Sequence, residues 1–352
     1  MHVGLGMESL DIIELQRKKV LRWSIILTGL TIGLLITIIA CLSIGSVDIP
    51  FAEVITILLG GGPERDSWII LHLRLPRILL AVLVGASLAV AGATMQGLFR
   101  NPMASPSVIG ISAGAAFGAS LAIVLGISWT SGAFAIPAMA FVFSFVTLFL
   151  VYAVSRNRSG YVPVETLLLA GIAIGSLFNA LVSALQYFAG EKLSGVVFWL
   201  MGGLNNATWD QVVISLPAVI LGCSVILMLS RDLNAMMVGE EQAGNLGINV
   251  NQIRIALLLA ASLVTAMAVS VSGVIGFVGL IIPHVVRILV GPDHRILLPA
   301  SIISGALFMV WTDTLARTII SPAELPVGII TSLLGAPFFI YLLMSRKKSM
   351  GW

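Results

Sequence analysis

The chain has 352 residues, of which 58% are hydrophobic and only 10% charged, and its mean hydropathy is +1.07. Soluble domains use about a quarter charged residues to solvate their surface, so 19 basic and 16 acidic side chains exclude a soluble domain and, more firmly, a disordered chain. A net charge of +3 is too small to indicate nucleic-acid binding. The composition predicts a polytopic, all-α membrane protein.

A helix needs about 20 apolar residues to cross the hydrocarbon core. Ten segments reach or approach this length, which predicts ten transmembrane helices. In chain order they are Trp23–Leu42, Pro76–Phe99, a third from after Pro106 to Leu125, Ala133–Val154, Val164–Ala189, Trp209–Leu229, Ile255–Ser272, Gly276–Val290, Pro299–Thr318 and Pro326–Met344. We expect a cytoplasmic N-terminal segment (1–22), a single transmembrane domain (23–345) and a cytoplasmic tail (346–352).

The connections between the spans also contain features that indicate local structure. Pro50–Leu59 reads as a short amphipathic piece, and Glu191–Asn206 has room for one short helix. The most polar interior stretch is 231–254. Between the seventh and eighth spans, Gly273 and Gly276 are compatible with either a turn or a kink.

The basic residues predict the orientation. Ten spans place both termini on one side, and the positive-inside rule assigns the richer side to the cytoplasm. With both termini inside, 14 basic residues lie inside: Arg17, Lys18, Lys19, Arg22, Arg100, Arg156, Arg158, Arg231, Arg254, Arg287, Arg295, Arg346, Lys347 and Lys348. The other five of the 19 lie outside: Arg65, Arg74, Arg77, Lys192 and Arg317. Arg74, Arg77 and Arg317 adjoin helix ends on the disfavoured side, so we expect them to have a function.

Several kinds of chemistry are missing from the sequence. No phosphate-binding P-loop and no spaced His or Cys set for a metal is present. Cys41 and Cys223 lie in apolar runs and are expected to be small buried hydrophobes. Asp313 is the nearest candidate for an intramembrane charge, and an ion pair with a nearby basic group such as Arg317 is its simplest interpretation. Uphill transport would therefore need energy from another subunit.

The second span has a face of small residues, including Gly85 and Gly92, that is suited to close helix packing.

Four motifs are the most informative about function. They are Arg74-Leu75-Pro76-Arg77, Asn101-Pro102-Met103-Ala104-Ser105-Pro106, Gly276-Phe277-Val278-Gly279-Leu280-Ile281-Ile282-Pro283-His284 and Gly335-Ala336-Pro337-Phe338-Phe339.

In this order the motifs resemble those of permease subunits of ATP-driven importers for iron chelates, haem and cobalamin, and the resemblance covers nearly the whole chain. Met103 departs slightly, since leucine is commoner there. The resemblance implies a type II ABC importer permease-like bundle in a prokaryotic plasma or inner membrane, without a cofactor, metal or enzymatic activity of its own. It also implies two ATP-binding cassette subunits, a second permease copy or sister permease, an extracytoplasmic substrate-binding protein and surrounding membrane lipid as partners.

By the same resemblance, Arg74, Arg77 and Arg317 would dock carboxylates on the two lobes of the binding protein. The planar guanidinium suits this role because it can hold a carboxylate with two hydrogen bonds. The alternative is that these arginines anchor lipid headgroups or cap helix ends.

The resemblance further assigns the loop after the sixth span to coupling with the ATPase. Its candidate residues are Gly239, Glu240, Glu241, Ala243, Leu246 and Gly247. A short helix with small residues would fit a partner groove, whereas the alternative is a solvated loop.

Asn101 and Met103 match the positions that narrow the cytoplasmic end of the pathway in this family. Asn-Pro is also a helix-stop signal, so both interpretations stay open. We expect Pro283 and His284 to be packing and turn elements rather than a ligand site.

The sequence predicts an importer permease, with a ferric siderophore as first choice of cargo and cobalamin or haem as the alternative. A secondary carrier working alone is disfavoured by the missing intramembrane charges, and a membrane enzyme by the missing cluster of His, Asp or Glu.

Overall fold

The computed structural model describes residues 4–127, 134–158 and 160–349, and every regular element in these ranges is a helix. The α-helices are α1 (Gly4–Ser43), α2 (Phe51–Leu58), α3 (Glu64–Trp68), α4 (Leu75–Leu98), α5 (Ile111–Leu125), α7 (Ala135–Ser155), α8 (Val164–Phe188), α9 (Leu193–Met201), α10 (Trp209–Met228), α11 (Ser230–Val238), α12 (Glu240–Asn245), α13 (Val250–Ser272), α14 (Val278–Val290), α15 (His294–Thr318) and α16 (Val327–Ser349). A π-helix, η1 (Ile69–Arg74), precedes α4, and η2 (Pro106–Ile109) and η3 (Gly190–Lys192) are 3-10 helices. The predicted start of the fourth span at Ala133 and the last three residues of the predicted tail lie outside the described ranges.

Ten of these helices coincide with the ten predicted spans and confirm the all-α polytopic fold. Seven of them are long and apolar enough to cross a membrane: α1, α4, α7, α8, α10, α13 and α15. The other three, α5, α14 and α16, carry shorter apolar stretches. The short helices expected between spans are also present, as α2 and α9, and the polar stretch 231–254 contains α11 and α12.

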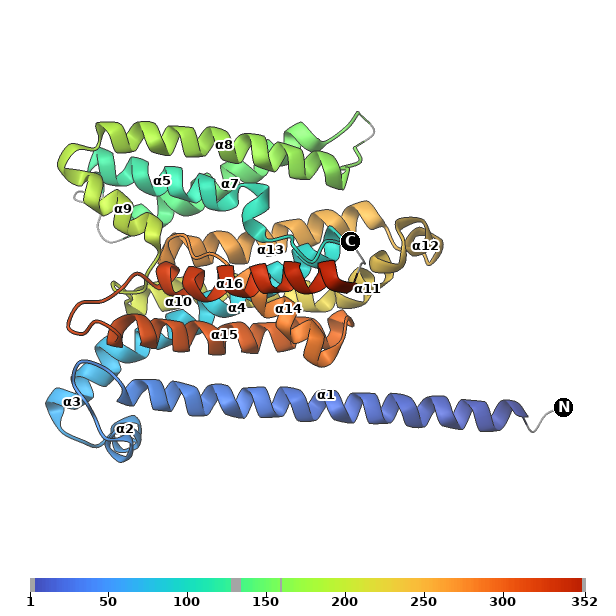
Figure 1. Cartoon of the computed structure of the whole chain (residues 1–352), viewed down its shortest axis with the longest axis horizontal. Helices are drawn as coiled ribbons and strands as arrows, with labels where there is room; N and C mark the ends of the chain where they lie inside the picture. Colours follow the sequence, from blue (N-terminus) through green and yellow to red (C-terminus); the bar gives the residue numbers. More distant parts are fainter. Residues whose placement is uncertain (1–3, 128–133, 159, 350–352) are drawn as a thin grey trace.

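Helix α4 forms the centre of the bundle (Figure 1). Helices α5, α7 and α8 lie along one side of the molecule and α1 along the opposite side. Almost all of α4 is buried. Its first half packs in a cluster with α1, α2 and α15, and its second half in a cluster with α5, α7 and α13.

Two glycines allow α4 to approach its neighbours closely. A Cβ atom on Gly85 would overlap the carbonyl oxygen of Gly305 in α15, and one on Gly92 would overlap that of Gly279 in α14. Backbones in direct contact maximise van der Waals packing where no hydrophobic effect drives helices together in lipid. The predicted small-residue face is thus confirmed.

Several helices begin earlier than the apolar pattern predicted, because polar residues cap them outside the apolar run. The Asp293 side chain accepts a hydrogen bond from the Arg295 backbone N–H and starts α15 before Pro299. The Asn249 side chain likewise caps α13. Pro76 does not start the second span: the helix runs back through η1 to Glu64. A proline lacks the N–H for the preceding turn, and a π-helical turn is one way to accommodate this.

The glycines after α13 mark a turn. Helix α13 ends at Ser272, and Gly273 has a φ of +68°, in the left-handed region that favours glycine. A Cβ there would overlap the backbone oxygen of Trp199 in α9. Helix α14 then starts at Val278 after Phe277, which has a φ of +67°.

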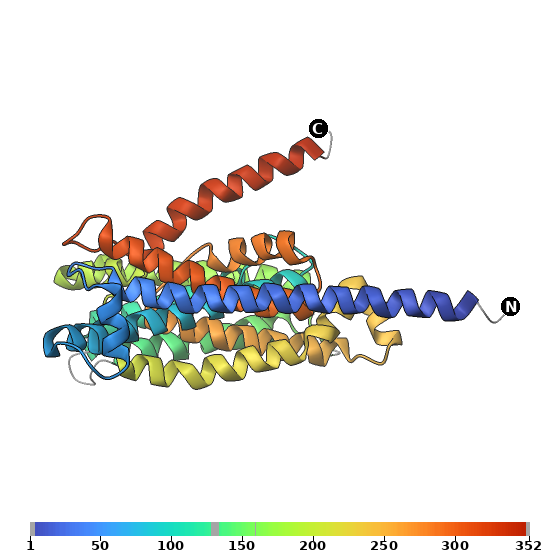
Figure 2. The ribbon, with the colours of Figure 1, turned by 90° about the horizontal axis from the view of Figure 1, so that it is seen from below.

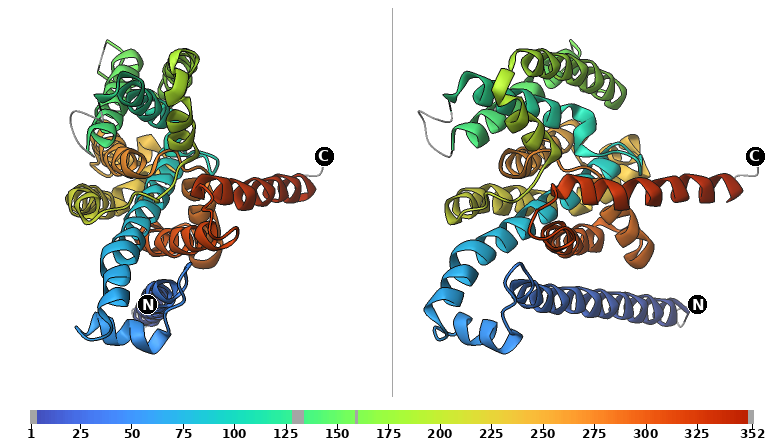
Figure 3. Two further views of the ribbon diagram at one scale, coloured as in Figure 1. Left: turned by 90° about the vertical axis from the view of Figure 1, so that its left-hand side faces the viewer. Right: turned by 60° about the vertical axis from the view of Figure 1, so that its left-hand side comes forward.

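The two ends of the bundle carry different elements. Helices α2, α3 and α9 lie at one end, and α11, α12 and the start of α1 lie at the other (Figure 1). We call these the outer and inner ends, following the predicted topology. Helix α16 diverges from the bundle, as Figures 2 and 3 show, and it exposes Leu333, Ile340 and Tyr341.

Candidate functional site

The structure brings the three predicted docking arginines together around one cavity at the outer end. This outer cavity has a volume of about 310 Å³. Arg74 comes from η1, Arg77 from the first turn of α4 and Arg317 from the last turn of α15. Its lining residues are Gly45, Ser46, Val47, Ile69, Leu73, Arg74, Arg77, Leu204, Asn205, Ala207, Arg317, Pro322 and Glu324.

All three arginines are buried, with relative exposures of 6%, 9% and 8% for Arg74, Arg77 and Arg317. Arg74 donates hydrogen bonds to the carbonyl oxygens of Leu42 at 2.6 Å and Ser43 at 3.1 Å, and also to that of Val47. These carbonyls belong to the end of α1 and the residues after it, where a helix leaves acceptors without intrahelical partners.

Arg317 binds the same end of α1, because its guanidinium donates to the carbonyl oxygen of Cys41. It also contacts the Thr314 hydroxyl at 3.4 Å. Arg74 and Arg317 thus fasten the end of α1 to η1 and α15. This is the helix-capping arrangement that the sequence left open as an alternative.

Arg77 is instead held by two carboxylates. The buried Asp313 of α15 accepts from Nε at 2.9 Å and from a terminal nitrogen at 2.9 Å, and Glu324 accepts from the other terminal nitrogen at 2.8 Å. The ion pair predicted for Asp313 with a nearby basic group is confirmed, but its partner is Arg77, which reaches it from the adjacent helix, and not Arg317, the example that the sequence offered. The sequence pattern did not indicate Glu324, although an acidic residue seven positions after Arg317 is a signal in a chain this poor in charge.

At the inner end, the predicted coupling residues form a protruding tip. We define the inner tip as residues 237–248, comprising the end of α11, α12 and the turn after it. Ala243 is fully buried, whereas Leu246 is 74% exposed and Val238 is 78% exposed. Gly247 has a φ of +84° with open space around it, which lets the chain turn back toward α13.

Gly239 and Glu241 have different surroundings. Gly239 has an extended backbone and is buried, and Glu241 is exposed. The exposed apolar side chains Met237 and Val238 were not among the predicted residues, because they precede the motif that identified the loop. Together with Leu246 they give the inner tip an apolar surface.

Glu240 points back to the bundle. Its carboxylate pairs with Arg254, whose side chain is completely buried, and accepts a hydrogen bond from the Tyr161 hydroxyl at 3.1 Å. Arg254 also lies over the Tyr161 ring and donates to the carbonyl oxygen of Val162 at 2.9 Å. Burial alone would raise the pKa of Glu240, but the hydrogen bond and charge of Arg254 hold that pKa below its ordinary value of 4.5.

The predicted gate residues follow α4 at the inner side. Asn101 is exposed, and its side-chain oxygen accepts from the Met103 backbone N–H at 2.9 Å, which stabilises a tight turn. Met103 is 40% exposed. The helix-stop role of Asn-Pro is therefore present, and it presents Met103 toward α14 and α16.

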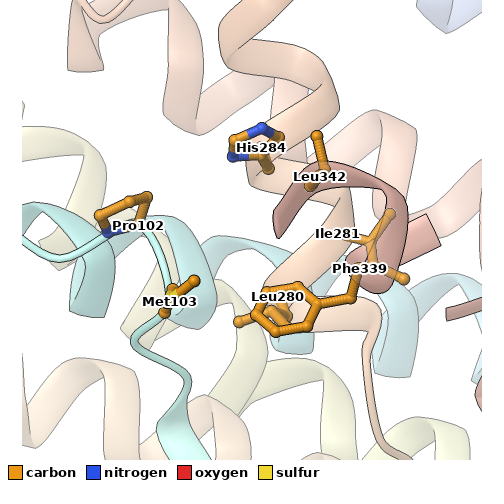
Figure 4. A pocket seen from close by; sticks show the side chains of 7 residues that line it. All are labelled: Pro102, Met103, Leu280, Ile281, His284, Phe339 and Leu342. Atoms are coloured by element: carbon orange, nitrogen blue, oxygen red, sulfur yellow. The ribbon is translucent and has the colours of Figure 1, made fainter. Parts of the chain in front are cut away.

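Met103 borders a small apolar cavity of about 20 Å³ (Figure 4). Leu280, Ile281 and His284 line it from α14, and Phe339 and Leu342 line it from α16. His284 thus faces an apolar cavity, and the described residues contain no cluster of His, Cys, Asp or Glu that could hold a metal ion.

The position of α14 beside this turn depends on Gln96 in α4. The Gln96 amide donates to the carbonyl oxygens of Gly279 and Leu280 at 3.4 and 3.2 Å, and its oxygen accepts from Arg287 at 3.0 Å. This buried amide links α4 to the first turn of α14 and to Arg287 in its third turn.

Comparisons with known proteins identify the family of this chain. The model of the FecCD transport family matches residues 33–345. The chain is 47% identical to the cobalamin import system permease protein BtuC of Halobacterium salinarum, over 82% of this chain and 76% of that protein. It is 40% identical to the hemin transport system permease protein HmuU of Yersinia pestis, over 91% of this chain and 96% of that protein.

A solved structure has the same fold. It shows an inward-facing conformation of a candidate metal-chelate type ABC transporter, with a TM-score of 0.81 and 39% identity over 91% of this chain and 99% of that chain. This chain is therefore a multi-pass membrane permease and a subunit of an ABC importer, not an enzyme. It belongs to the FecCD transport family, and its relatives include permeases of import systems for cobalamin, hemin, iron(3+)-hydroxamate and molybdate.

Proposed function

We propose that this permease moves an intact metal chelate into the cell, with a ferric siderophore as the first candidate. The similarity to a metal-chelate type transporter along almost the whole of both chains is the observation that carries this proposal. Cobalamin is the second candidate, and its support is the 47% identity to a cobalamin permease.

The test is uptake into proteoliposomes that contain the permease, its ATPase and its binding protein. We expect ATP-dependent accumulation of a radiolabelled ferric siderophore. Accumulation of labelled cobalamin or haem instead would transfer the assignment to that cargo. Uptake that persists without the ATPase subunit would contradict an ATP-driven importer.

We further propose that the outer cavity is where the substrate-binding protein docks. Its lining has three arginines and one glutamate, and this excess of positive charge suits a partner with carboxylates at its surface. The counter-ion of Arg77 is partly exposed, so Arg77 is the first candidate for direct contact with the binding protein. Arg74 and Arg317 hold the wall of the cavity, so their part in docking is indirect.

For ATPase coupling we propose the inner tip. The exposed Val238 and Leu246 supply an apolar contact for a groove, and the buried Ala243 lets α12 lie flat against the chain below it. The pair of Glu240 with Arg254 gives the tip a rigid link to α13. Two ATP-binding cassette subunits would bind two such tips in a dimeric importer.

The second permease copy is proposed to cover the diverging face of α16. A helix that leaves the bundle with Leu333, Ile340 and Tyr341 exposed presents an apolar face that the described part of this chain leaves uncovered. Met103, which borders the cavity next to α16, and Asn101, which holds the turn that carries Met103, would then narrow the inner end of the shared pathway. Other exposed apolar faces, such as that of α8, remain for membrane lipid.

A further inference from the structure

Arg77 at the outer cavity has two carboxylate partners of very different exposure. The residue Asp313 is 1% exposed and binds Arg77 through two guanidinium nitrogens. The side chain of Glu324 keeps 36% of its surface exposed and binds a single terminal nitrogen at 2.8 Å. Since solvent screens exposed ion pairs strongly, the contact with Glu324 is the weaker of the two.

The two acidic residues also differ in how the fold holds them. Asp313 lies within α15, where the helix backbone fixes its position. Glu324 lies in the connection between α15 and α16, residues 319–326, and it lines the cavity. The neighbouring Leu325 backbone N–H binds the carbonyl oxygen of Ala316 at 2.9 Å, so the connection itself is anchored while the Glu324 side chain faces the cavity.

The other two arginines are less able to change partners. Arg74 and Arg317 donate to backbone carbonyls at the end of α1, and removing them would leave buried acceptors without partners. An incoming carboxylate can take the Arg77 nitrogen from Glu324 without orphaning a buried group, because the released Glu324 carboxylate can turn into water.

We propose that Glu324 is an exchangeable stand-in for the carboxylate of the docking partner. In the free permease it occupies the outward-facing nitrogen of Arg77, and an acidic side chain of the binding protein displaces it on docking. Asp313 stays in place throughout and keeps the guanidinium oriented. This inference rests on the proposed docking at the outer cavity.

Glu324 therefore limits the affinity of the permease for the binding protein. The measurement is the dissociation constant between the binding protein and the permease–ATPase complex in lipid nanodiscs, determined by biolayer interferometry at constant salt. Glu324→Gln removes the competing charge and is expected to tighten binding about two- to fivefold, the range set by a partly exposed ion pair. The matched control is Glu64→Gln in α3, which removes an exposed outer carboxylate that makes no ion pair with an arginine among the described residues. It is expected to leave affinity unchanged.

A second arm links the effect to Arg77. The double variant Arg77→Gln, Asp313→Asn removes both charges of the buried pair, so that neither is left unpaired. It should weaken binding, and adding Glu324→Gln to it should have no further effect.

The outcomes separate the two proposals. If the double variant binds as tightly as the wild type, docking at Arg77 is wrong. If the double variant binds the binding protein more weakly, while Glu324→Gln leaves the affinity unchanged or lowers it, docking at Arg77 stands. The proposed exchange of Glu324 is then overturned. An equal gain from Glu64→Gln would assign the effect to general surface charge and would also overturn the exchange.

Discussion

Arg254 and Glu240 form an ion pair that connects a completely buried guanidinium in α13 to the first residue of α12 at the inner tip. The Tyr161 ring and hydroxyl complete the contact from the loop before α8. Two consecutive helices, α12 and α13, thus meet a segment 79 positions earlier in the chain at one charged group. The pair therefore links α12 to α13 directly, in addition to the short connection of residues 246–249.

Glu240→Gln should therefore destabilise the protein more than Glu241→Gln. The first substitution leaves Arg254 buried without its negative partner, at an expected cost of about 1–2 kcal/mol after allowing for the partial exposure of Glu240. Glu241 is exposed, so its substitution should cost less than about 0.5 kcal/mol. Thermal unfolding in detergent, followed by intrinsic fluorescence, measures both. Equal unfolding temperatures for the two variants would show that the pair does not stabilise the tip.

Gly247→Trp should uncouple ATP hydrolysis from transport while the protein still inserts in the membrane. The substitution puts a large side chain on the inner tip at a φ of +84°, where residues other than glycine are strained. Reconstituted complexes should hydrolyse ATP but accumulate less cargo per ATP. Gly247→Asn is the control, since asparagine tolerates this backbone conformation and is much smaller. Normal coupling in the tryptophan variant would remove the inner tip from the ATPase interface.

Gly92→Ala should be one of the most damaging single-methyl additions in the bundle. Its Cβ would overlap the backbone oxygen of Gly279, which cannot rotate away as a side chain would. We expect a loss of about 3 kcal/mol or more, at or above the upper end of ordinary overpacking. Gly29→Ala in α1 is the matched control, because nothing lies within 4 Å of its added Cβ. Yield and unfolding temperature after purification compare the two, and similar values would contradict the close contact of α4 with α14.

Asp293 should keep stabilising the start of α15 under acidic conditions. Hydrogen bonds from Arg295, Asn234 and Lys19 hold the pKa of Asp293 well below its ordinary value of 3.8. A lowered folded-state pKa gives stability that is present above the unfolded-state pKa and is lost as the pH falls toward the folded-state value.

The difference in unfolding temperature between wild type and Asp293→Asn should therefore be constant from neutral pH down to about pH 5, and it should shrink only below about pH 4. Thermal scans across this range test the expectation. A difference that disappears already near pH 6 would mean that the contacts of Asp293 contribute little.

Local sequence was sufficient to predict the class, the number and the order of the spans. Hydropathy over about 20 residues depends only on neighbours in the chain, and all ten predicted spans are helices. The helix starts were less accurate, since caps such as Asp293 and Asn249 lie outside the apolar pattern. The helical turns before Pro76 were missed because proline ordinarily reads as a start signal.

The sequence by itself determined that Arg74, Arg77 and Arg317 are unusual, because the charge rule disfavours them at the outer side. Only the tertiary structure decided what each one does: two of them cap the end of α1, and Arg77 binds Asp313 and Glu324. The physical reason is that a charge is costly to bury unless a partner satisfies it. These partners lie 27 to 276 positions away in the chain, so folding brings them together and no local pattern records them.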